Sequence, residues 1–517
     1  MAAGAAGAEQ SDDSRPNIIF LLTDDQRADT LSIAGNPHIQ TPSLDRLARE
    51  GTRYTNAFTV APICAPSRFA FLSGQYERVN GLGFNSPYQV SEAQWERTYP
   101  ALLRESGYHT GFVGKFGVQY YEFAEGAAAK FDYWRAHDGW LPFFPKDLPD
   151  NPATAIYADA RNTITTEIMG EYIAEFLDTR PSNKPFQLSV SFSAPHNSVV
   201  SSMYSEGADP DCDAYACRVM GYAANKNPRL RGHPVYDSLY RAEGIPIAAD
   251  TGRDPFRFIP QGVIDHTARH KWYAYNYDRE LQPEHLIRYY QTITGIDQVV
   301  GELLAQLKSL GLADNTIIVF SSDHGLLNGE YGTGGKALLY DLVAKVPLIV
   351  FDPRRPPSDS QRVNDDLVLS VDVAPTILAL AGLEAPESMQ GKDLLAADPP
   401  REAVFLESLT VAEGNPFIEA LRTQDMKYVR YLERQGCPYT EEQLDFAEQE
   451  PVYEQLFDLA RDPGERVNLA DDPRYAEALA RMREDTRRQS IVLTHQGRRY
   501  KSSLPVPRRP VDGVYCW

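Results

Sequence analysis

Apolar runs with the length of strands alternate with amphipathic stretches along most of the chain. The apolar runs span residues 16–23, 108–113, 184–192, 316–322 and 346–351. Continuous apolar runs of this length are typical of parallel strands that helices cover on both faces. The pattern therefore predicts a buried, mostly parallel sheet.

The stretches between these runs have the apolar periodicity of helices. Helices are predicted at residues 41–51, 99–107, 163–177, 284–310 and 371–381. Gly311 directly follows the predicted helix at 284–310, and a glycine is common just after the end of a helix. Strands that alternate with helices in this way predict an α/β domain.

The pattern changes near residue 400. Antiparallel strands are predicted at 403–409 and 426–432, then a strand, a turn and a helix entry over 454–469, a helix over 476–489 and a basic, irregular tail. The chain of 517 residues is long for one ordinary domain. We expect a disordered tail at 1–14, a large α/β domain at 15–398 and a smaller α+β domain with an antiparallel sheet at 399–517.

The segment 199–283 has no clear period and is rich in Pro, Gly, Tyr and Arg. So long an irregular stretch inside a domain is typical of a functional insertion. Its aromatic and cationic residues could line a carbohydrate subsite or could cover the core. These residues are Lys271, Trp272, Tyr273, Tyr275, Tyr277 and Arg279.

The formal net charge of −20 argues against general binding to nucleic acid or to anionic membranes. No apolar run approaches the roughly 20 residues of a membrane span, and no signal peptide is present in the sequence.

Five cysteines are present. Cys212 and Cys217 are spaced for a tight local disulfide, and Cys437 and Cys516 could form a second one. Two disulfides would indicate an oxidising compartment, whereas four free thiols would suit a cytosolic enzyme.

Cys64 opens the most informative stretch, Cys64-Ala-Pro-Ser-Arg68, at the junction of a loop and a predicted helix. Pro66 can occupy the first turn of that helix, where its missing N–H has no cost. Cys64 would then lie at the positive N-terminus of a helix beside Arg68, where anions are favoured. A buried structural cysteine is the alternative.

Polar residues follow several predicted strands. They are Asp24, Asp25, Lys115, His196, Asp323 and His324, with Lys336 in a glycine-rich loop after the last pair. Strand ends share one edge of a parallel sheet, and ligands bind in the crevice there. Three carboxylates in one place require a cation, for which Ca²⁺ or Mg²⁺ is the usual choice. The imidazole of His324 leaves Mn²⁺ or Zn²⁺ open.

The string Cys-x-Pro-Ser-Arg resembles the signature of the type I sulfatases, which share the alkaline phosphatase-like α/β/α fold. The resemblance implies that Cys64 is converted to formylglycine by a maturation enzyme. It implies metal ligands at Asp24, Asp25, Asp323, His324 and the converted Cys64. It also implies that Arg68, Lys115, His196 and Lys336 contact the sulfate or act in catalysis. The segment 456–469 resembles the C-terminal domain of the family.

The resemblance implies a mechanism in which one hydroxyl of the hydrated formylglycine attacks the sulfur of a sulfate ester. Asp25 or a neighbour would accept the proton, and His196 or Lys336 would protonate the departing alcohol. Lys115, Lys336, Arg68 and the metal would stabilise charge on the sulfuryl oxygens.

One position departs from the family. Many relatives carry a histidine two residues after the lysine that corresponds to Lys115, whereas here Phe116 and Gly117 follow it. The sequence therefore does not identify the base that removes the proton when the covalent sulfate is expelled. The alternatives are His196, another histidine or a metal-linked water.

The sequence thus predicts a sulfatase that removes O-sulfate groups from a sulfated carbohydrate, such as an algal polysaccharide or a glycosaminoglycan. Ca²⁺ is the expected metal, with Mg²⁺ or Mn²⁺ as alternatives, and the expected location is periplasmic or secreted. A phosphonate monoester or phosphodiester hydrolase of the same superfamily is the second hypothesis. A catalytically inactive carbohydrate-binding relative is the third.

Overall fold

The computed structural model describes residues 15–84, 90–118, 126–139, 141–147, 152–203, 233–264, 278–355, 362–409, 415–433, 446 and 449–501. Several predictions lie outside these residues: the disordered tail at 1–14, the disulfides of Cys212, Cys217, Cys437 and Cys516, and the subsite residues Lys271, Trp272, Tyr273, Tyr275 and Tyr277. Within the described residues, no helix is long and apolar enough to cross a membrane.

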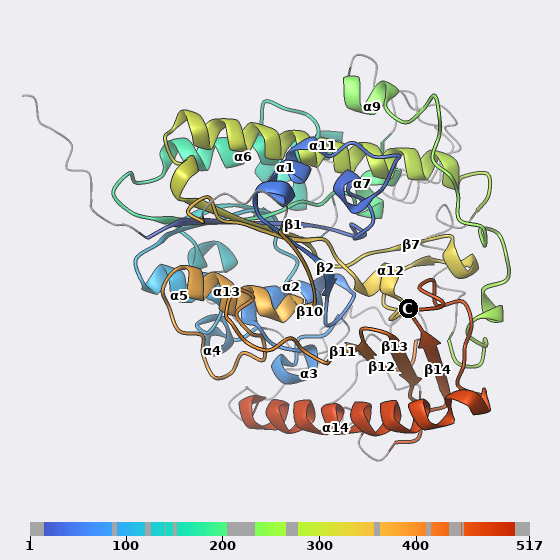
Figure 1. Ribbon diagram of the computed structural model, residues 1–517. Helices are drawn as coiled ribbons and strands as arrows, with labels where there is room; N and C mark the ends of the chain where they lie inside the picture. The colour runs from blue at the N-terminus through green and yellow to red at the C-terminus, as the bar shows by residue number, and fades with distance from the viewer. Residues whose placement is uncertain are drawn as a thin grey trace, which may run out of the picture.

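The main sheet has eight strands in the order β10-β2-β9-β6-β1-β5-β3-β4 (Figure 1). All five predicted strands are present, as β1 Asn17–Thr23, β3 His109–Lys115, β5 Phe186–Ser191, β6 Thr316–Ser322 and β9 Leu348–Phe351. Only β9 runs antiparallel to its neighbours β2 and β6 in this sheet of the described residues. The predicted mostly parallel sheet is therefore confirmed.

Three strands of this sheet were not predicted. They are β2 Thr52–Phe58, β4 Tyr133–His137 and β10 Arg362–Leu369. Strands β4 and β10 form the two edges of the sheet, and their sequences mix charged and apolar residues. A strand with so little continuous apolar character gives no local signal, because its pairing depends on its neighbours.

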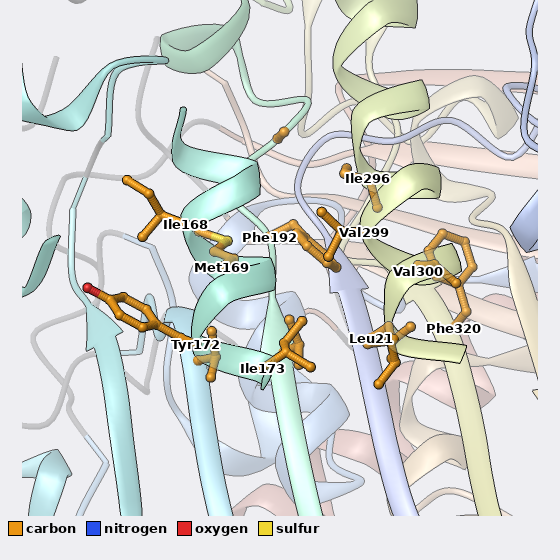
Figure 2. Close-up of a cluster of buried hydrophobic side chains, with 14 of the residues drawn as sticks. Leu21, Ile168, Met169, Tyr172, Ile173, Phe192, Ile296, Val299, Val300 and Phe320 are labelled. Carbon is orange, nitrogen blue, oxygen red and sulfur yellow. The ribbon is translucent and has the colours of Figure 1, made fainter. Parts of the chain in front are cut away.

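Helices cover both faces of the sheet, as alternate residues of β1 show. Ile19 and Leu21 face the cluster beneath α1 Pro42–Glu50, α6 Thr165–Thr179 and α11 Gln282–Ser309. Figure 2 shows side chains of α6 and α11 packed over Leu21, Phe192 and Phe320.

The opposite face of β1 presents Ile18, Phe20 and Leu22 to a second cluster. This cluster lies beneath α2 Cys64–Ser73, α5 Tyr99–Glu105 and α13 Val373–Leu380. In Figure 1 the two groups of helices lie on opposite sides of the sheet. The predicted α/β/α sandwich is confirmed.

A separate antiparallel sheet follows in the order β11-β12-β13-β14. Its strands are β11 Ala403–Ser408, β12 Ile418–Thr423, β13 Met426–Tyr431 and β14 Tyr453–Asp458. Helix α14 Ala476–Lys501 lies across this sheet (Figure 1). The predicted end of this helix at residue 489 is wrong, because Leu493 continues its buried face. No helix begins within the segment 459–469, where a helix entry was predicted.

Buried ion pairs join the short helix α3 Glu77–Asn80 to the second sheet. Arg78, on this helix, is 1% exposed and lies 2.5 Å from both Glu407 of β11 and Glu419 of β12. It also donates a hydrogen bond to Ser490 Oγ of α14 at 2.9 Å. Both carboxylates are fully buried, so Arg78 compensates two charges that no water reaches.

In the described part of the segment 199–283, the helices that precede α11 are short. They include the end of α7 Asn197–Ser201, α9 Pro234–Ser238 and a single 3₁₀ turn at Pro255–Arg257. The segment packs on α11, where Tyr240 Oη lies 2.6 Å from Thr294 Oγ1. Arg279, a predicted subsite residue, donates instead to the backbone oxygen of Thr251 at 2.9 Å.

The remaining short elements are α4 Glu92–Trp95, α12 Asp341–Ala344 and the hairpin of β7 Leu327–Asn328 with β8 Gly334–Gly335.

Candidate active site

The predicted site residues lie at one edge of the main sheet. Asp24 and Asp25 follow β1, Asp323 and His324 follow β6, His196 follows β5 and Lys115 ends β3. These four strands are consecutive and parallel in the order β6-β1-β5-β3. The common direction of the strands therefore gathers residues that are up to 300 positions apart, as the sequence predicts.

Cys64 lies at the first residue of α2 and faces this edge. The residue is 7% exposed, and its Sγ lies 3.8 Å from Asp24 Oδ1 and 3.0 Å from Lys336 Nζ. Burial raises the pKa of the Cys64 thiol, but Lys115 and Lys336 outweigh this effect, and the pKa lies well below its usual value. The surroundings of Cys64 thus stabilise negative charge.

Two lysines surround the position of Cys64. Lys115 forms an ion pair with Asp24 Oδ2, and Lys336 lies 2.9 Å from Asp25 Oδ1. The Lys336 loop follows the β7–β8 hairpin, where Gly329 and Gly332 have positive φ angles of 93° and 72°. The two ammonium groups thus bring positive charge to two adjacent carboxylates.

Arg68 lies one turn after Cys64 on α2 and is 2% exposed. Its Nη2 is 3.2 Å from Asp24 Oδ2 and 3.0 Å from Asp323 Oδ2, and its Nη1 donates to the backbone oxygen of Lys115 at 3.0 Å. Arg68 therefore contacts residues at the ends of β1, β3 and β6 and links them beside Cys64.

The two carboxylates beside Arg68 differ in their protonation. Burial opposes ionisation of Asp24, but Lys115 and Arg68 hold its pKa well below the usual value. Burial raises the pKa of Asp323 to about 6, and the charge of Asp24 adds to this effect. Asp24 is the more strongly ionised of the two.

The tautomer of His196 follows from its hydrogen bonds. The backbone N–H of Ser198 donates to His196 Nδ1 at 3.1 Å, so this nitrogen is an acceptor. In the neutral ring the proton is therefore on Nε2, which lies 4.0 Å from Asp25 Oδ2. His196 presents an N–H donor to the site.

Four side chains could together hold a metal ion. The ligand atoms of Asp24, Asp25, Cys64 and His324 lie within 4.8 Å of one another, and all four residues are buried. Asp25 Oδ2 and His324 Nε2 receive no hydrogen bond from any described residue. His324 Nδ1 lies 2.9 Å from the backbone oxygen of Gly325, to which it must donate, so Nε2 keeps a free lone pair. Buried acceptors without donors fit a bound cation.

Asp323 is not a member of this group of four. Its Oδ1 accepts hydrogen bonds from the backbone of Asp25 at 3.1 Å and of His324 at 2.8 Å, while its Oδ2 faces Arg68. A role for Asp323 as a metal ligand stays a prediction.

The missing histidine corresponds to a position without room for a side chain. Gly117 has φ +64°, and a Cβ there would lie 3.0 Å from Cδ of Arg68. Arg68 thus fills the space beside Lys115, and the structure offers no substitute for the histidine at this position.

Sequence reasoning missed two residues near the site. His137 pairs with Lys115 across β3 and β4, and its Nε2 lies 3.1 Å from Ser193 Oγ. Burial, with Lys115 and Arg68 adding to it, lowers the pKa of His137 to about 3. Tyr289, on α11, contacts the backbone of the Asp25 turn. A predicted strand at 133–137 would have indicated His137, but no local pattern indicates Tyr289.

Comparison with known proteins agrees with this site. The family model for sulfatases matches residues 16–383. The N-acetylglucosamine-6-O-sulfatase of Bacteroides thetaiotaomicron is 28% identical, over 94% of this chain and 89% of the relative. An ulvan-active sulfatase of Formosa agariphila is 26% identical, over 90% of this chain and 79% of the relative.

Two solved structures share the fold. One, in complex with its substrate D-glucosamine-2-N,6-O-disulfate, has a TM-score of 0.65 at 22% identity and covers 95% of this chain and 99% of its own. The phosphonate monoester hydrolase of Agrobacterium radiobacter has a TM-score of 0.69 at 20% identity, with 93% and 96% covered.

The fold is the alkaline phosphatase-like α/β sandwich. Within this fold class the chain belongs to the sulfatase family, whose members hydrolyse sulfuric esters.

Proposed function

We propose that this sulfatase removes O-sulfate groups from a sulfated carbohydrate, with formylglycine formed from Cys64 as nucleophile and a divalent cation beside it. The observation that carries the proposal is the position of Cys64. Its Sγ lies 3.0 Å from Lys336 and within 4.8 Å of the ligand atoms of Asp24, Asp25 and His324. In the proposed enzyme the formylglycine oxygens would take the place of this thiol.

The named activities of two relatives support the carbohydrate substrate. One acts on N-acetylglucosamine 6-O-sulfate groups and the other on ulvan. A buried site with two lysines and one arginine suits a sulfate group against a net charge of −20, because the positive charge is local. The irregular segment 199–283 is the proposed substrate-binding region, and 15–398 and 399–517 are the proposed domains.

The chain's own side chains would divide the work. Asp24, Asp25 and His324 would hold the cation, with Asp323 beside them, and Ca²⁺ is the proposed ion. The cation would supply Lewis-acid stabilisation of charge on the substrate oxygens. Lys115, Lys336 and Arg68 would stabilise the sulfuryl oxygens. Lys336, as an ammonium group, would protonate the departing alcohol, and His196 would donate a hydrogen bond to it from Nε2.

The proposal includes a maturation enzyme that acts on Cys64 and a periplasmic or secreted location. One relative, from Drosophila melanogaster, is named an extracellular sulfatase. The alignment with it covers 74% of this chain and 31% of the relative.

Two measurements test the proposal. Mass spectrometry of the peptide that contains Cys64, from active enzyme, should show the aldehyde; an unmodified thiol would contradict the nucleophile. Sulfate release from defined sulfated oligosaccharides should exceed turnover of an aryl phosphonate. Dominant phosphonate turnover would favour the second hypothesis, and binding of the sugars without turnover by converted protein would favour the third.

A further inference from the structure

The turn that carries Asp25 has a backbone conformation that is uncommon for residues other than glycine. Asp25 has φ +69°, in the left-handed region that favours glycine. A non-glycine residue in this region costs about 1 kcal/mol or more and persists only when its surroundings hold it. The contacts that hold this turn therefore decide where the Asp25 carboxylate points.

Most of these contacts come from the neighbouring strand ends. The backbone N–H of Asp24 donates to the oxygen of Ala194 at 3.2 Å, that of Asp25 to Asp323 Oδ1 at 3.1 Å, and that of Gln26 to Ser322 Oγ at 2.9 Å. These bonds hold the N–H side of the turn. They leave the backbone oxygen of Asp25 and the N–H of Arg27 without a partner from these strands.

Tyr289 of α11 completes the turn. Its hydroxyl donates to the backbone oxygen of Asp25 at 2.7 Å and accepts from the backbone N–H of Arg27 at 3.1 Å. One hydroxyl thus bridges two backbone groups that are two residues apart. The ring of Tyr289 is fully buried, so water does not compete for these groups.

The helix behind Tyr289 is a rigid support. Helix α11 packs on α6 in the core, and the segment around Tyr240 packs on α11 through Thr294. Burial holds the pKa of Tyr289 well above its usual value, so the hydroxyl keeps its proton and its donor role.

We propose that Tyr289 is a positioning residue that fixes the left-handed Asp25 turn and thereby sets the affinity of the site for its metal ion. The inference rests on the metal site proposed above. Residues that orient metal ligands change metal affinity by about 10- to 100-fold when they are substituted.

The test compares Tyr289→Phe with Tyr290→Phe. Both substitutions remove one hydroxyl from the same helix, but Tyr290 Oη accepts from Asn36 Nδ2 at 3.0 Å, a contact of Asn36 rather than of the Asp25–Arg27 backbone. Ca²⁺ would be titrated calorimetrically into full-length protein that a chelator has stripped, and the melting temperature would be measured with and without Ca²⁺.

We expect Tyr289→Phe to raise the Kd for Ca²⁺ by 10-fold or more, and Tyr290→Phe to leave it within about two-fold of wild type. Saturating Ca²⁺ should restore most of the activity of Tyr289→Phe, which a general loss of structure would not allow. Equal Ca²⁺ affinity of Tyr289→Phe and wild type would overturn the inference. Absence of Ca²⁺ binding by wild-type protein would instead contradict the proposed metal site.

A second measurement needs no variant. Hydrogen exchange of the Arg27 amide in wild-type protein should be as slow as that of buried strand amides, because Tyr289 accepts its hydrogen. Exchange at the rate of an exposed amide would also overturn the inference.

Discussion

Lys336 Nζ lies 3.0 Å from Cys64 Sγ and 2.9 Å from Asp25 Oδ1, so one ammonium group contacts both the nucleophile position and a proposed metal ligand. This geometry supports the proposed role of Lys336 in the reaction itself, beyond general attraction of anions.

Substitution of Lys336 by Ala should therefore lower kcat by about 100-fold or more, because a charge in a buried site is lost. The exposed Lys308→Ala variant, at the end of α11, is the control and should keep wild-type kcat. Sulfate release under saturating substrate is the measurement. Equal kcat values for the two variants would exclude Lys336 from the chemistry.

Removal of the metal should abolish activity and lower stability. Without the metal, Asp25 Oδ2 and His324 Nε2 are buried and have no hydrogen-bond partner among the described residues. A ligand at 100 times its Kd stabilises the folded state by about 2.7 kcal/mol, so a chelator should lower the melting temperature by several degrees. Separate additions of Ca²⁺, Mg²⁺ and Mn²⁺ would rank the metals. Full activity after exhaustive chelation would contradict the site.

Gly117→Ala should disturb Arg68. The new Cβ would lie 3.0 Å from Arg68 Cδ, and φ +64° adds about 1 kcal/mol of backbone strain. Gly311→Ala is a matched control, because Gly311 has φ +69° and open space around its Cβ position. Both variants should lose stability in urea denaturation, but only Gly117→Ala should also lose activity. An active Gly117→Ala enzyme would show that Arg68 tolerates displacement.

Arg78→Met should destabilise the protein by about 3–5 kcal/mol, because it leaves Glu407 buried without a compensating charge and leaves Glu419 with Arg430 alone. Denaturation curves of this variant and of the exposed Arg46→Met would measure the difference. A loss of stability below about 1 kcal/mol would mean that the packing of α3 against the second sheet does not depend on Arg78.

His137 should make the protein sensitive to acid. Its folded pKa is about 3, far below the unfolded value of 6.5, so only the unfolded state takes up a proton between these values. The contribution of His137 is thus fully present above pH 6.5 and is lost as the pH falls towards 3. The loss between pH 6.5 and pH 5 is about 2 kcal/mol.

The Gln variant of His137 should show a shallower decline of stability over this pH range than wild type or the exposed His38→Gln. Parallel declines in all three proteins would contradict the assignment.

The sequence predicted the site far better than it predicted the groups that support it. Asp24, His196 and Asp323 follow apolar strands, and the C-terminal ends of parallel strands must meet at one edge. His137 is the last residue of a strand whose charged and aromatic residues give no period, so its place beside Lys115 was not predictable. Arg78 and Tyr289 lie on helices, where only the packing of distant elements decides what a polar side chain contacts.

The five predicted strands succeeded for the same reason. Each is buried on both faces, so its apolar character is continuous. The extension of α14 to residue 501 and the edge strand β10 depend on contacts with elements far away in the sequence.

The burial of Cys64 sets an order of events in the life of the protein. Cys64 is 7% exposed in the folded protein. Its thiol is covered by Asp24 and Lys336, which are far apart in the sequence and meet only on folding. An enzyme that modifies Cys64 would have to bind the chain around it as an extended, unfolded peptide. The proposed modification would therefore compete with folding in time, and protein that folded first would keep its thiol.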